Sequence, residues 1–220
     1  MIDFVAARRM MVDGQVRTAD VTDPRLLSAM LELPRERFFP EEKASLAYLD
    51  IDVAVSEGVQ PPRRLLKPMV LAKLIQAAEI DETCHVLDVG CATGYAAALL
   101  AQLAASVVSL EEDAGLARQA TAALAASGAS NAKVVTGPLA AGSPADAPYD
   151  VILMEGATEI VPATLIKQLK TGGRLVCILG RGPGHATIYQ RTETDISGRA
   201  VFDAAAPLLP GFAKPQEFVF

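Results

Sequence analysis

The chain has 220 residues, of which 51% are hydrophobic, and a formal net charge of −6. This length and apolar content fit one globular α/β domain and exclude a disordered chain. The acidic charge, without clusters of Lys and Arg, offers no surface for duplex nucleic acid or for anionic membranes. We therefore expect neither nucleic acid nor a membrane as a partner.

The cysteines and the apolar stretches indicate the compartment. Cys84, Cys91 and Cys177 form no CxxC pair, and three cysteines would leave one unpaired, so free thiols in a reducing compartment are expected. Residues 1–10 lack the apolar core of a signal peptide. Residues 95–110 are interrupted by Gln102 and fall short of the roughly 18 residues of a membrane span. The sequence predicts a cytoplasmic protein.

We expect one domain over residues 1–220, in three consecutive parts. Residues 1–80 form a helical N-terminal region, residues 84–209 an α/β core and residues 210–220 a tail. Prolines punctuate the first part, because proline is tolerated in the first turn of a helix but not in its interior. They predict helices over 23–33 and 68–78, a short helical segment over 40–48 and an irregular segment over 56–68.

The second part alternates short apolar runs with helical windows, which is typical of a parallel sheet with crossover helices. We expect a Rossmann-like, doubly wound and mostly parallel sheet with helices on both faces and residues 85–89 near its centre. The predicted strands are 85–89, 106–110, 132–136, 149–154 and 173–179, and the predicted helices are 95–103, 114–127 and 162–170. A terminal antiparallel hairpin is expected, with strands 187–192 and 199–202 and Ile196-Ser197-Gly198 between them.

The most informative segment is the glycine turn at the end of the first core strand, in the sequence Val86-Leu87-Asp88-Val89-Gly90-Cys91-Ala92-Thr93-Gly94. Glycine permits the positive φ of a sharp turn and lets the backbone approach a ligand closely. The N–H groups of the following helix can then face an electronegative group. A tight turn that binds nothing is the alternative, since a glycine turn alone is weak evidence.

An acid at the end of the next strand favours a ligand. The carboxylate of Glu111 can accept both hydroxyls of a ribose. The turn lacks the GxGxxG spacing of the dinucleotide fingerprint, since Ala92 and Tyr95 stand where glycines allow a pyrophosphate to approach. An adenosine ligand without phosphate fits better, and S-adenosylmethionine is the common cofactor of this kind. His85 and His185 have no ligand at metal-binding spacing, so no metal site is expected.

Several segments together resemble the protein-L-isoaspartate O-methyltransferase family, over roughly residues 8–209. The most specific are Met11-Val12-Asp13-Gly14-Gln15-Val16-Arg17 and Leu33-Pro34-Arg35-Glu36-Arg37-Phe38-Phe39-Pro40, because generic methyltransferases share only the cofactor loop. The other similar segments are residues 23–30, 47–50, 88–95, 147–152, 168–170 and 172–176.

The resemblance implies transfer of a methyl group from S-adenosylmethionine to the carboxylate of an isoaspartyl residue in a damaged protein. The cofactor-binding residues expected from the turn and from the resemblance are Asp88, Gly90, Cys91, Ala92, Gly94, Glu111, Glu112, Pro138 and Leu139. Gly137-Pro138 stands where the family has a Gly-Asp pair that contacts adenine.

On the acceptor side, the family's hydroxyl position falls on Leu66, which cannot donate a hydrogen bond. Arg63 and Arg64 stand beside it and could grip a substrate carboxylate, although a solvated pair in a proline-rich loop is the commoner situation. Leu66 and Pro138 leave a second hypothesis open, a non-catalytic or retargeted paralogue that binds S-adenosylmethionine. A nicotinamide-dependent oxidoreductase is a third, which the glycine spacing disfavours.

Overall fold

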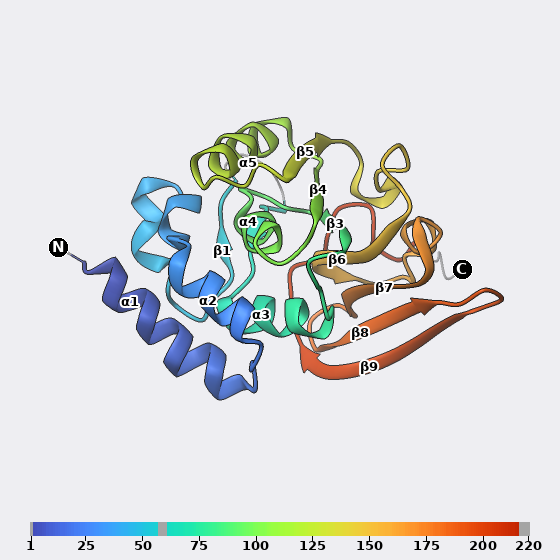
Figure 1. The fold of residues 1–220 in the computed structure, drawn as a ribbon, viewed down its shortest axis with the longest axis horizontal. Coiled ribbons are helices and arrows are strands. Elements are labelled where there is room, and N and C mark those ends of the chain that lie inside the picture. Colours follow the sequence, from blue (N-terminus) through green and yellow to red (C-terminus); the bar gives the residue numbers. More distant parts are fainter. Residues whose placement is uncertain (1, 57–60, 216–220) are drawn as a thin grey trace, which may run out of the picture.

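A computed structural model describes residues 2–56 and 61–215, and its main feature is a seven-stranded sheet in the order β5-β4-β3-β6-β7-β8-β9 (Figure 1). The strands from β5 to β7 run parallel, and β8 and β9 are antiparallel. This arrangement confirms the predicted sheet, with β3 between β4 and β6. The strands are β3 His85–Val89, β4 Ser106–Glu111, β5 Ala132–Thr136, β6 Tyr149–Thr158, β7 Leu169–Leu179, β8 Gly184–Arg191 and β9 Ile196–Ala204.

Side chains alternate along each strand and feed two hydrophobic clusters, one on each face of the sheet. Along β3, Val86 belongs to the cluster shared with the N-terminal region, and Leu87 belongs to the opposite cluster. The first cluster runs in sequence from Met11 to Ile188, so the N-terminal helices and the sheet share one core. Val86, Val107 and Leu153 belong to this first cluster. Because side chains alternate along a strand, every second residue after them, at the carboxyl ends of β3, β4 and β6, faces the same cluster.

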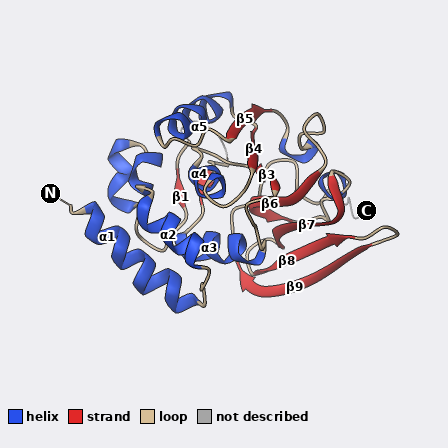
Figure 2. Cartoon of the chain, in the orientation of Figure 1, coloured by secondary structure: helices blue, strands red, loops and turns tan. Residues whose placement is uncertain are grey.

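Helices cover the two faces unequally (Figures 1 and 2). The first face carries α3 Pro68–Ala77 and α4 Tyr95–Ala101, with α5 Ala114–Ala126 toward the β5 edge. The other face carries only short helical segments, including α6 Ala163–Ile166, and the C-terminal segment. The predicted helix over 162–170 was too long, because Leu169 already pairs with Tyr149 as the first residue of β7.

The N-terminal region agrees with the predicted helices and is more irregular between them. Asp23 caps α2 by accepting a hydrogen bond from the Arg25 N–H, and Pro24 opens that helix. Within 56–68, where an irregular segment was predicted, Arg64 and Leu65 form the short strand β2, and residues 57–60 lie outside the described part. The elements are α1 Phe4–Met11, a π-helical turn Val12–Val16, 3-10 turns Arg17–Ala19, Arg35–Phe38 and Glu41–Leu46, α2 Pro24–Glu32, β1 Val53–Ala54 and β2 Arg64–Leu65.

The C-terminal hairpin is present, but its turn was placed wrongly by the sequence. Residues Ile196-Ser197-Gly198, predicted as the turn, belong to β9 and pair with β8. The chain instead reverses between Thr192 and Asp195, where the Thr192 N–H and hydroxyl both donate to the Asp195 carbonyl. A Thr/Asp turn of this kind has no glycine signal, which explains the error.

The C-terminal segment, which the sequence did not place, lies across the end of β6. The Ala157 N–H donates to the Pro207 carbonyl, and the Leu209 N–H donates to the Ala157 carbonyl. Leu209 and Phe212 are buried in the second cluster. Residues 207–212 thus close over the carboxyl edge of the sheet. Among the described helices, none has the length and apolar character needed to cross a membrane.

Candidate active site

The carboxyl ends of β3, β4 and β6 meet at the point where the strand order reverses. The chain leaves β3 toward β4 and β5 on one side, and later returns to add β6 on the other side. In open α/β sheets, ligands bind in the crevice at such a switch point. The predicted cofactor turn follows β3, so the sequence and the topology indicate the same location.

The turn itself has the backbone that its residues predicted. Gly90 and Gly94 have φ angles of 87° and 91°, and Ala92 also has a positive φ of 49°. The Gly94 carbonyl accepts a hydrogen bond from the Ala98 N–H in the first turn of α4. A Cβ at Gly94 would lie 3.2 Å from the backbone of Ala120, so α5 packs directly against the turn. Cys91 is fully buried, and burial raises the pKa of its thiol.

Glu111 lies at the end of β4 as predicted, and its carboxylate is completely buried. It accepts hydrogen bonds from the backbone N–H of Ala92 at 2.8 Å, of Glu112 at 2.9 Å and of Asp113 at 3.2 Å. It also forms an ion pair with Arg63, whose Nη2 lies 3.2 Å from Oε2 and whose Nε lies 3.3 Å from Oε1. The glycine turn and the acid are therefore one hydrogen-bonded unit.

Arg63 was expected beside the acceptor, with a solvated loop position as the alternative, and the structure contradicts the solvated position. It is 5% exposed, and its Nη2 also donates to the Gly90 carbonyl at 2.8 Å. Its neighbour Arg64 is half-buried and points elsewhere, donating to the Asp52 carbonyl. The two arginines thus serve different places, because Arg63 directly precedes the short strand β2 and Arg64 begins it, and successive residues of an extended chain face opposite sides.

Asp88 and Glu155 are a buried carboxyl pair beside this unit. Asp88 is the last residue but one of β3, and Glu155 lies on β6 on the same face of the sheet. Burial raises the pKa of Asp88 to about 7, and burial followed by the charge of Asp88 raises the pKa of Glu155 well above its usual value. None of their four carboxyl oxygens has a hydrogen-bond partner among the described residues. Burial and the mutual repulsion of the two carboxyl groups therefore favour a state in which at least one of them carries a proton.

Arg35 and Tyr95 add two donors next to this pair. The guanidinium of Arg35 lies 4.5 Å from the centre of the Tyr95 ring and donates to the carbonyls of Ala47 and Leu66. Its Nη1 and the Tyr95 hydroxyl are buried, and the described part of the chain offers them no hydrogen-bond partner. Burial lowers the pKa of Arg35, while the charge of Glu155 opposes this effect. The arrangement has unpartnered donors and acceptors inside a buried site, which suits a polar ligand.

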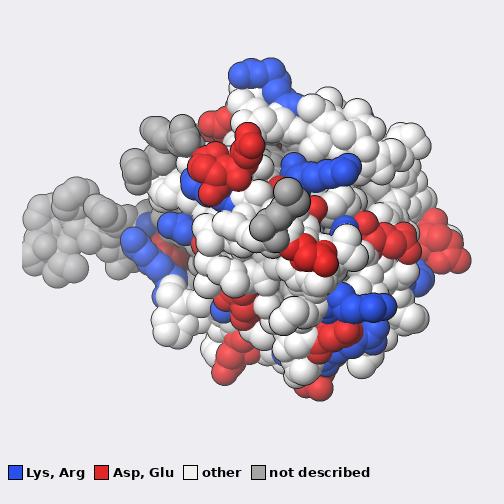
Figure 3. Space-filling view, turned by 90° about the vertical axis from the view of Figure 1, so that its left-hand side faces the viewer, with Lys and Arg blue, Asp and Glu red and all other residues white. Residues whose placement is uncertain are grey.

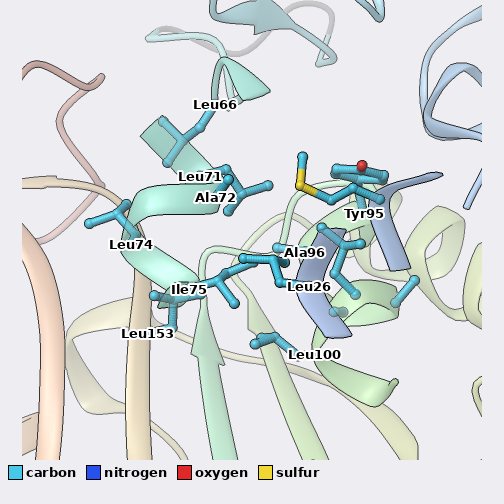
Figure 4. Close-up of a cluster of buried hydrophobic side chains, with 14 of the residues drawn as sticks. Leu26, Leu66, Leu71, Ala72, Leu74, Ile75, Tyr95, Ala96, Leu100 and Leu153 are labelled. Atoms are coloured by element: carbon cyan, nitrogen blue, oxygen red, sulfur yellow. The ribbon is translucent and has the colours of Figure 1, made fainter. Parts of the chain in front are cut away.

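Leu66 lies in the apolar core, where Figure 4 shows its side chain in one cluster with Leu71, Ile75 and Leu153. Its backbone carbonyl, and not its side chain, takes part in the polar network through Arg35. The predicted match to a family hydroxyl therefore falls on a packed side chain.

The remaining predicted cofactor residues lie at the ends of β4 and β5. Glu112 and Pro138 are exposed and flank this edge, while Leu139 is buried and begins a 3-10 turn. A cleft of about 790 Å³ opens beside the turn, lined by Thr93, Asp113 and Leu116 among others.

Sequence reasoning missed Arg35, and it left Glu155 open between the cofactor cleft and a role at a helix start. Glu155 follows the apolar run of β6, and an acid at the end of a core strand was the available signal. Arg35 had no local signal, since only the fold brings residues 35, 66 and 95 together. No cluster of three metal-ligating side chains occurs within residues 2–56 and 61–215.

The strand order, with a glycine turn after the central strand and an acid after its neighbour, defines a Rossmann-like, nucleoside-binding methyltransferase domain. Comparison with known proteins makes the assignment specific. The family model described as protein-L-isoaspartate(D-aspartate) O-methyltransferase matches residues 7–204. The chain belongs to this family, which confirms the resemblance found in the sequence.

Named relatives match most of the chain. The chain is 37% identical to protein-L-isoaspartate O-methyltransferase 1 of Rhodopseudomonas palustris, over 88% of this chain and 77% of that protein. It is also 37% identical to protein-L-isoaspartate O-methyltransferase of Roseiflexus sp., over 98% of both chains.

Solved structures support the fold. A structure named protein-L-isoaspartate O-methyltransferase is 25% identical, with a TM-score of 0.80 over 93% of this chain and 66% of that one. A second, from Plasmodium falciparum and in complex with S-adenosyl-L-homocysteine, is 16% identical with a TM-score of 0.77 over 95% of this chain and 99% of that one. At 16% identity this second likeness concerns the fold alone.

Proposed function

We propose that this chain is an S-adenosylmethionine-dependent carboxyl methyltransferase that acts on L-isoaspartyl residues of damaged proteins. The observation that carries the proposal is the family match over residues 7–204, together with the glycine turn and Glu111 at the switch point of the sheet. Its relatives are named as enzymes, which favours catalysis over the alternative of a non-catalytic paralogue.

The residues present fit the cofactor. Gly90 takes the positive φ that the turn needs, with the Arg63 guanidinium and Leu209 packed against it, and Glu111 ends the neighbouring strand where it can accept ribose hydroxyls. Glu112, Pro138 and Leu139 would border the adenine, and Asp88 and Cys91 would lie near the methionine part. When bound, S-adenosylmethionine supplies an electrophilic methyl group on a sulfonium.

Methyl transfer to a carboxylate requires alignment of the carboxylate oxygen with the methyl group, and it requires no proton transfer. A carboxylate has an ordinary pKa near ~4, so it is ionised at neutral pH and needs no general base. Catalysis then rests on holding the carboxylate oxygen in line with the methyl group. Arg35 and Tyr95 have buried N–H and O–H groups without partners among the described residues, which qualifies them as positioning donors. Arg64, half-buried beside Arg63, is a further candidate for gripping the substrate carboxylate.

The setting of the reaction follows from two further features. Cys84, Cys91 and Cys177 are free and buried, which supports a reducing compartment such as the cytoplasm. On the face shown in Figure 3, basic and acidic side chains are interspersed, which suits a peptide or protein substrate better than a nucleic acid.

Tritiated methyl transfer tests the proposal directly. We expect methylation of a peptide that contains L-isoaspartate and none of the matched peptide with normal aspartate. A protein that binds S-adenosylmethionine but methylates neither peptide would contradict the proposal.

A further inference from the structure

A hollow of about 510 Å³ lies beside the ends of β6 and β7, outside the cofactor turn. Both strands run parallel to β3, so the hollow opens at the same edge of the sheet as the turn that follows β3. Its volume falls within the roughly 300–1,000 Å³ of sites that bind a drug-sized ligand. Its lining includes Glu159, Ile160, Val161, Leu179, Arg181 and Lys214.

The C-terminal segment connects this hollow to the cofactor turn. At one end Leu209 lies against the turn, because a Cβ at Gly90 would be 3.0 Å from its Cδ2. At the other end the Lys214 N–H donates to Oε2 of Glu159 at 2.9 Å, within the lining of the hollow. Leu209 and Lys214 are five positions apart, and five residues span at most about 18 Å. A peptide with its isoaspartyl carboxylate at the turn can therefore place a residue a few positions away in the hollow.

Two cations border the hollow, on a chain whose net charge is −6. Arg181 and Lys214 are exposed, and neither forms an ion pair with another residue of 2–56 and 61–215. Glu159 is the acid of the lining, and its carboxylate already accepts the Lys214 N–H. The lining thus carries two positive charges against one negative charge, which complements an acidic segment of a partner.

The other side chains of the lining are apolar. Val161 is 51% exposed, and Ile160 and Leu179 are partly exposed in the same hollow. Single exposed apolar side chains are common on protein surfaces, whereas several in one hollow beside a polar rim are typical of a binding site. An apolar side chain of a peptide would cover them and remove their surface from water.

We propose that this hollow is the docking site for the substrate segment next to the isoaspartyl residue, and that it favours a segment with an apolar and an acidic side chain. The inference rests on the proposed function and extends it to the choice among damaged proteins. The apolar side chain covers Val161 and Leu179, and the acidic side chain lies between Arg181 and Lys214. The cofactor takes no part in this choice, because the hollow lies outside the turn.

Fluorescence anisotropy of labelled peptides tests the docking site without relying on catalysis. Two isoaspartyl peptides carry either Val-Glu or Val-Gln at the third and fourth positions on both sides of the isoaspartate and are otherwise identical. Each is titrated with the intact protein in the presence of S-adenosylhomocysteine. The peptide with Glu should bind about threefold to tenfold more tightly, which is the effect of one or two exposed ion pairs. This preference should fall as NaCl is added, because salt screens exposed charges.

Variants identify the groups that make the choice. Arg181→Gln combined with Lys214→Gln should abolish the preference and leave the affinity for the peptide with Gln unchanged. Val161→Asp should weaken the binding of both peptides, because it places a carboxylate in the apolar part of the hollow. Arg199→Gln, the matched change on β9, should alter neither affinity. All four side chains are exposed, so the variants should fold, and circular dichroism together with unchanged binding of S-adenosylhomocysteine checks this.

Equal wild-type affinity for the two peptides, absence of binding by either, or a preference that survives the double change would overturn the inference. If the preference and its response to the variants hold but neither peptide is methylated in the tritium assay, the docking site is right and the proposed function is wrong. If both peptides are methylated with the same KM, the proposed function stands and the docking site is wrong.

Discussion

The guanidinium of Arg63 and the carboxylate of Glu111 form a buried ion pair, with 3.2 Å between Nη2 and Oε2, that ties the proline-rich segment before α3 to the end of β4. The same guanidinium holds the Gly90 carbonyl. One side chain therefore links three parts of the site that are distant in sequence. The stability of the fold and the accessibility of the cofactor turn depend on the same contact.

Glu111→Gln should destabilise the protein strongly, because it leaves the Arg63 cation buried without a counter-charge. Breaking one side of a buried ion pair typically costs about 3–5 kcal/mol of the free energy of unfolding. Urea denaturation followed by circular dichroism measures this loss. The double variant Arg63→Met with Glu111→Gln is the control and should lose less than the single variant, since no unpaired charge remains. A loss under about 1 kcal/mol for Glu111→Gln would contradict this expectation, because it would mean that the unpaired Arg63 guanidinium is solvated by water or moves out of the site.

The carboxyl pair Asp88 and Glu155 should make the protein less stable as the pH rises toward neutrality. The pKa of Asp88 is raised by burial to about 7, above its value near ~4 in an unfolded chain. The folded state therefore holds a proton that the unfolded state has lost, and this contribution to stability is complete below about pH 4 and is lost as the pH rises through about 7.

Urea denaturation between pH 5 and pH 8 measures this dependence, whose slope should approach about 1.4 kcal/mol per pH unit for one proton. Asp88→Asn cannot ionise and should flatten the profile. The carboxyl groups with lowered pKa, such as Asp146 beside Lys133, titrate below this range and do not interfere. A wild-type stability that rises from pH 5 to pH 8 would contradict the assignment.

Much of this site follows from sequence pattern, and the part that does not depends on tertiary contacts. The strand His85–Val89, the turn after it and Glu111 were predictable, because a short apolar run, glycines and a strand-end acid are local signals. The burial of Arg63 was not predictable, because it results from the pairing of β2 with β1 and the approach of this hairpin to β4.

The two other surprises have similar causes. The predicted strand ended before Glu155, because the apolar run stops at Met154. In the structure, β6 continues to Thr158 and places the Glu155 carboxyl group in the core. The sequence did not predict where Leu209 and Phe212 lie, because the pairing of Leu208 with Ala157, a tertiary contact, positions them. Sequence reasoning therefore located the cofactor turn but not the groups that cover it.

Ala92→Gly should stabilise the protein. Ala92 has a φ of 49°, a conformation that an alanine adopts at a cost and a glycine adopts freely. Relief of this strain should outweigh the greater chain entropy of glycine in the unfolded state and raise the free energy of unfolding by up to about 1 kcal/mol. Thermal unfolding checks this, with Ala98→Gly inside helix α4 as the opposite control, which should lower the melting temperature. Equal destabilisation by both changes would mean that the Cβ of Ala92 contributes packing that outweighs the strain.

Leu66→Ser should weaken the fold and not add an acceptor-side donor. The Leu66 side chain is completely buried in the cluster with Leu71 and Leu153, so the change leaves a cavity and places a hydroxyl among apolar groups. Losses of this kind are about 3–5 kcal/mol. Urea denaturation gives the loss, and the tritium assay on the isoaspartyl peptide shows whether the hydroxyl helps. A gain in activity with little loss of stability would place the Leu66 side chain at the acceptor and contradict its packing role.

The central claim is that the Gly90–Gly94 turn and Glu111 hold the adenosine and methionine parts of S-adenosylmethionine. A crystal structure of the protein grown with S-adenosylmethionine tests it most directly. The account predicts ribose hydroxyls within hydrogen-bond distance of Glu111 and the methionine part against Gly90. A bound cofactor that lies elsewhere would contradict it.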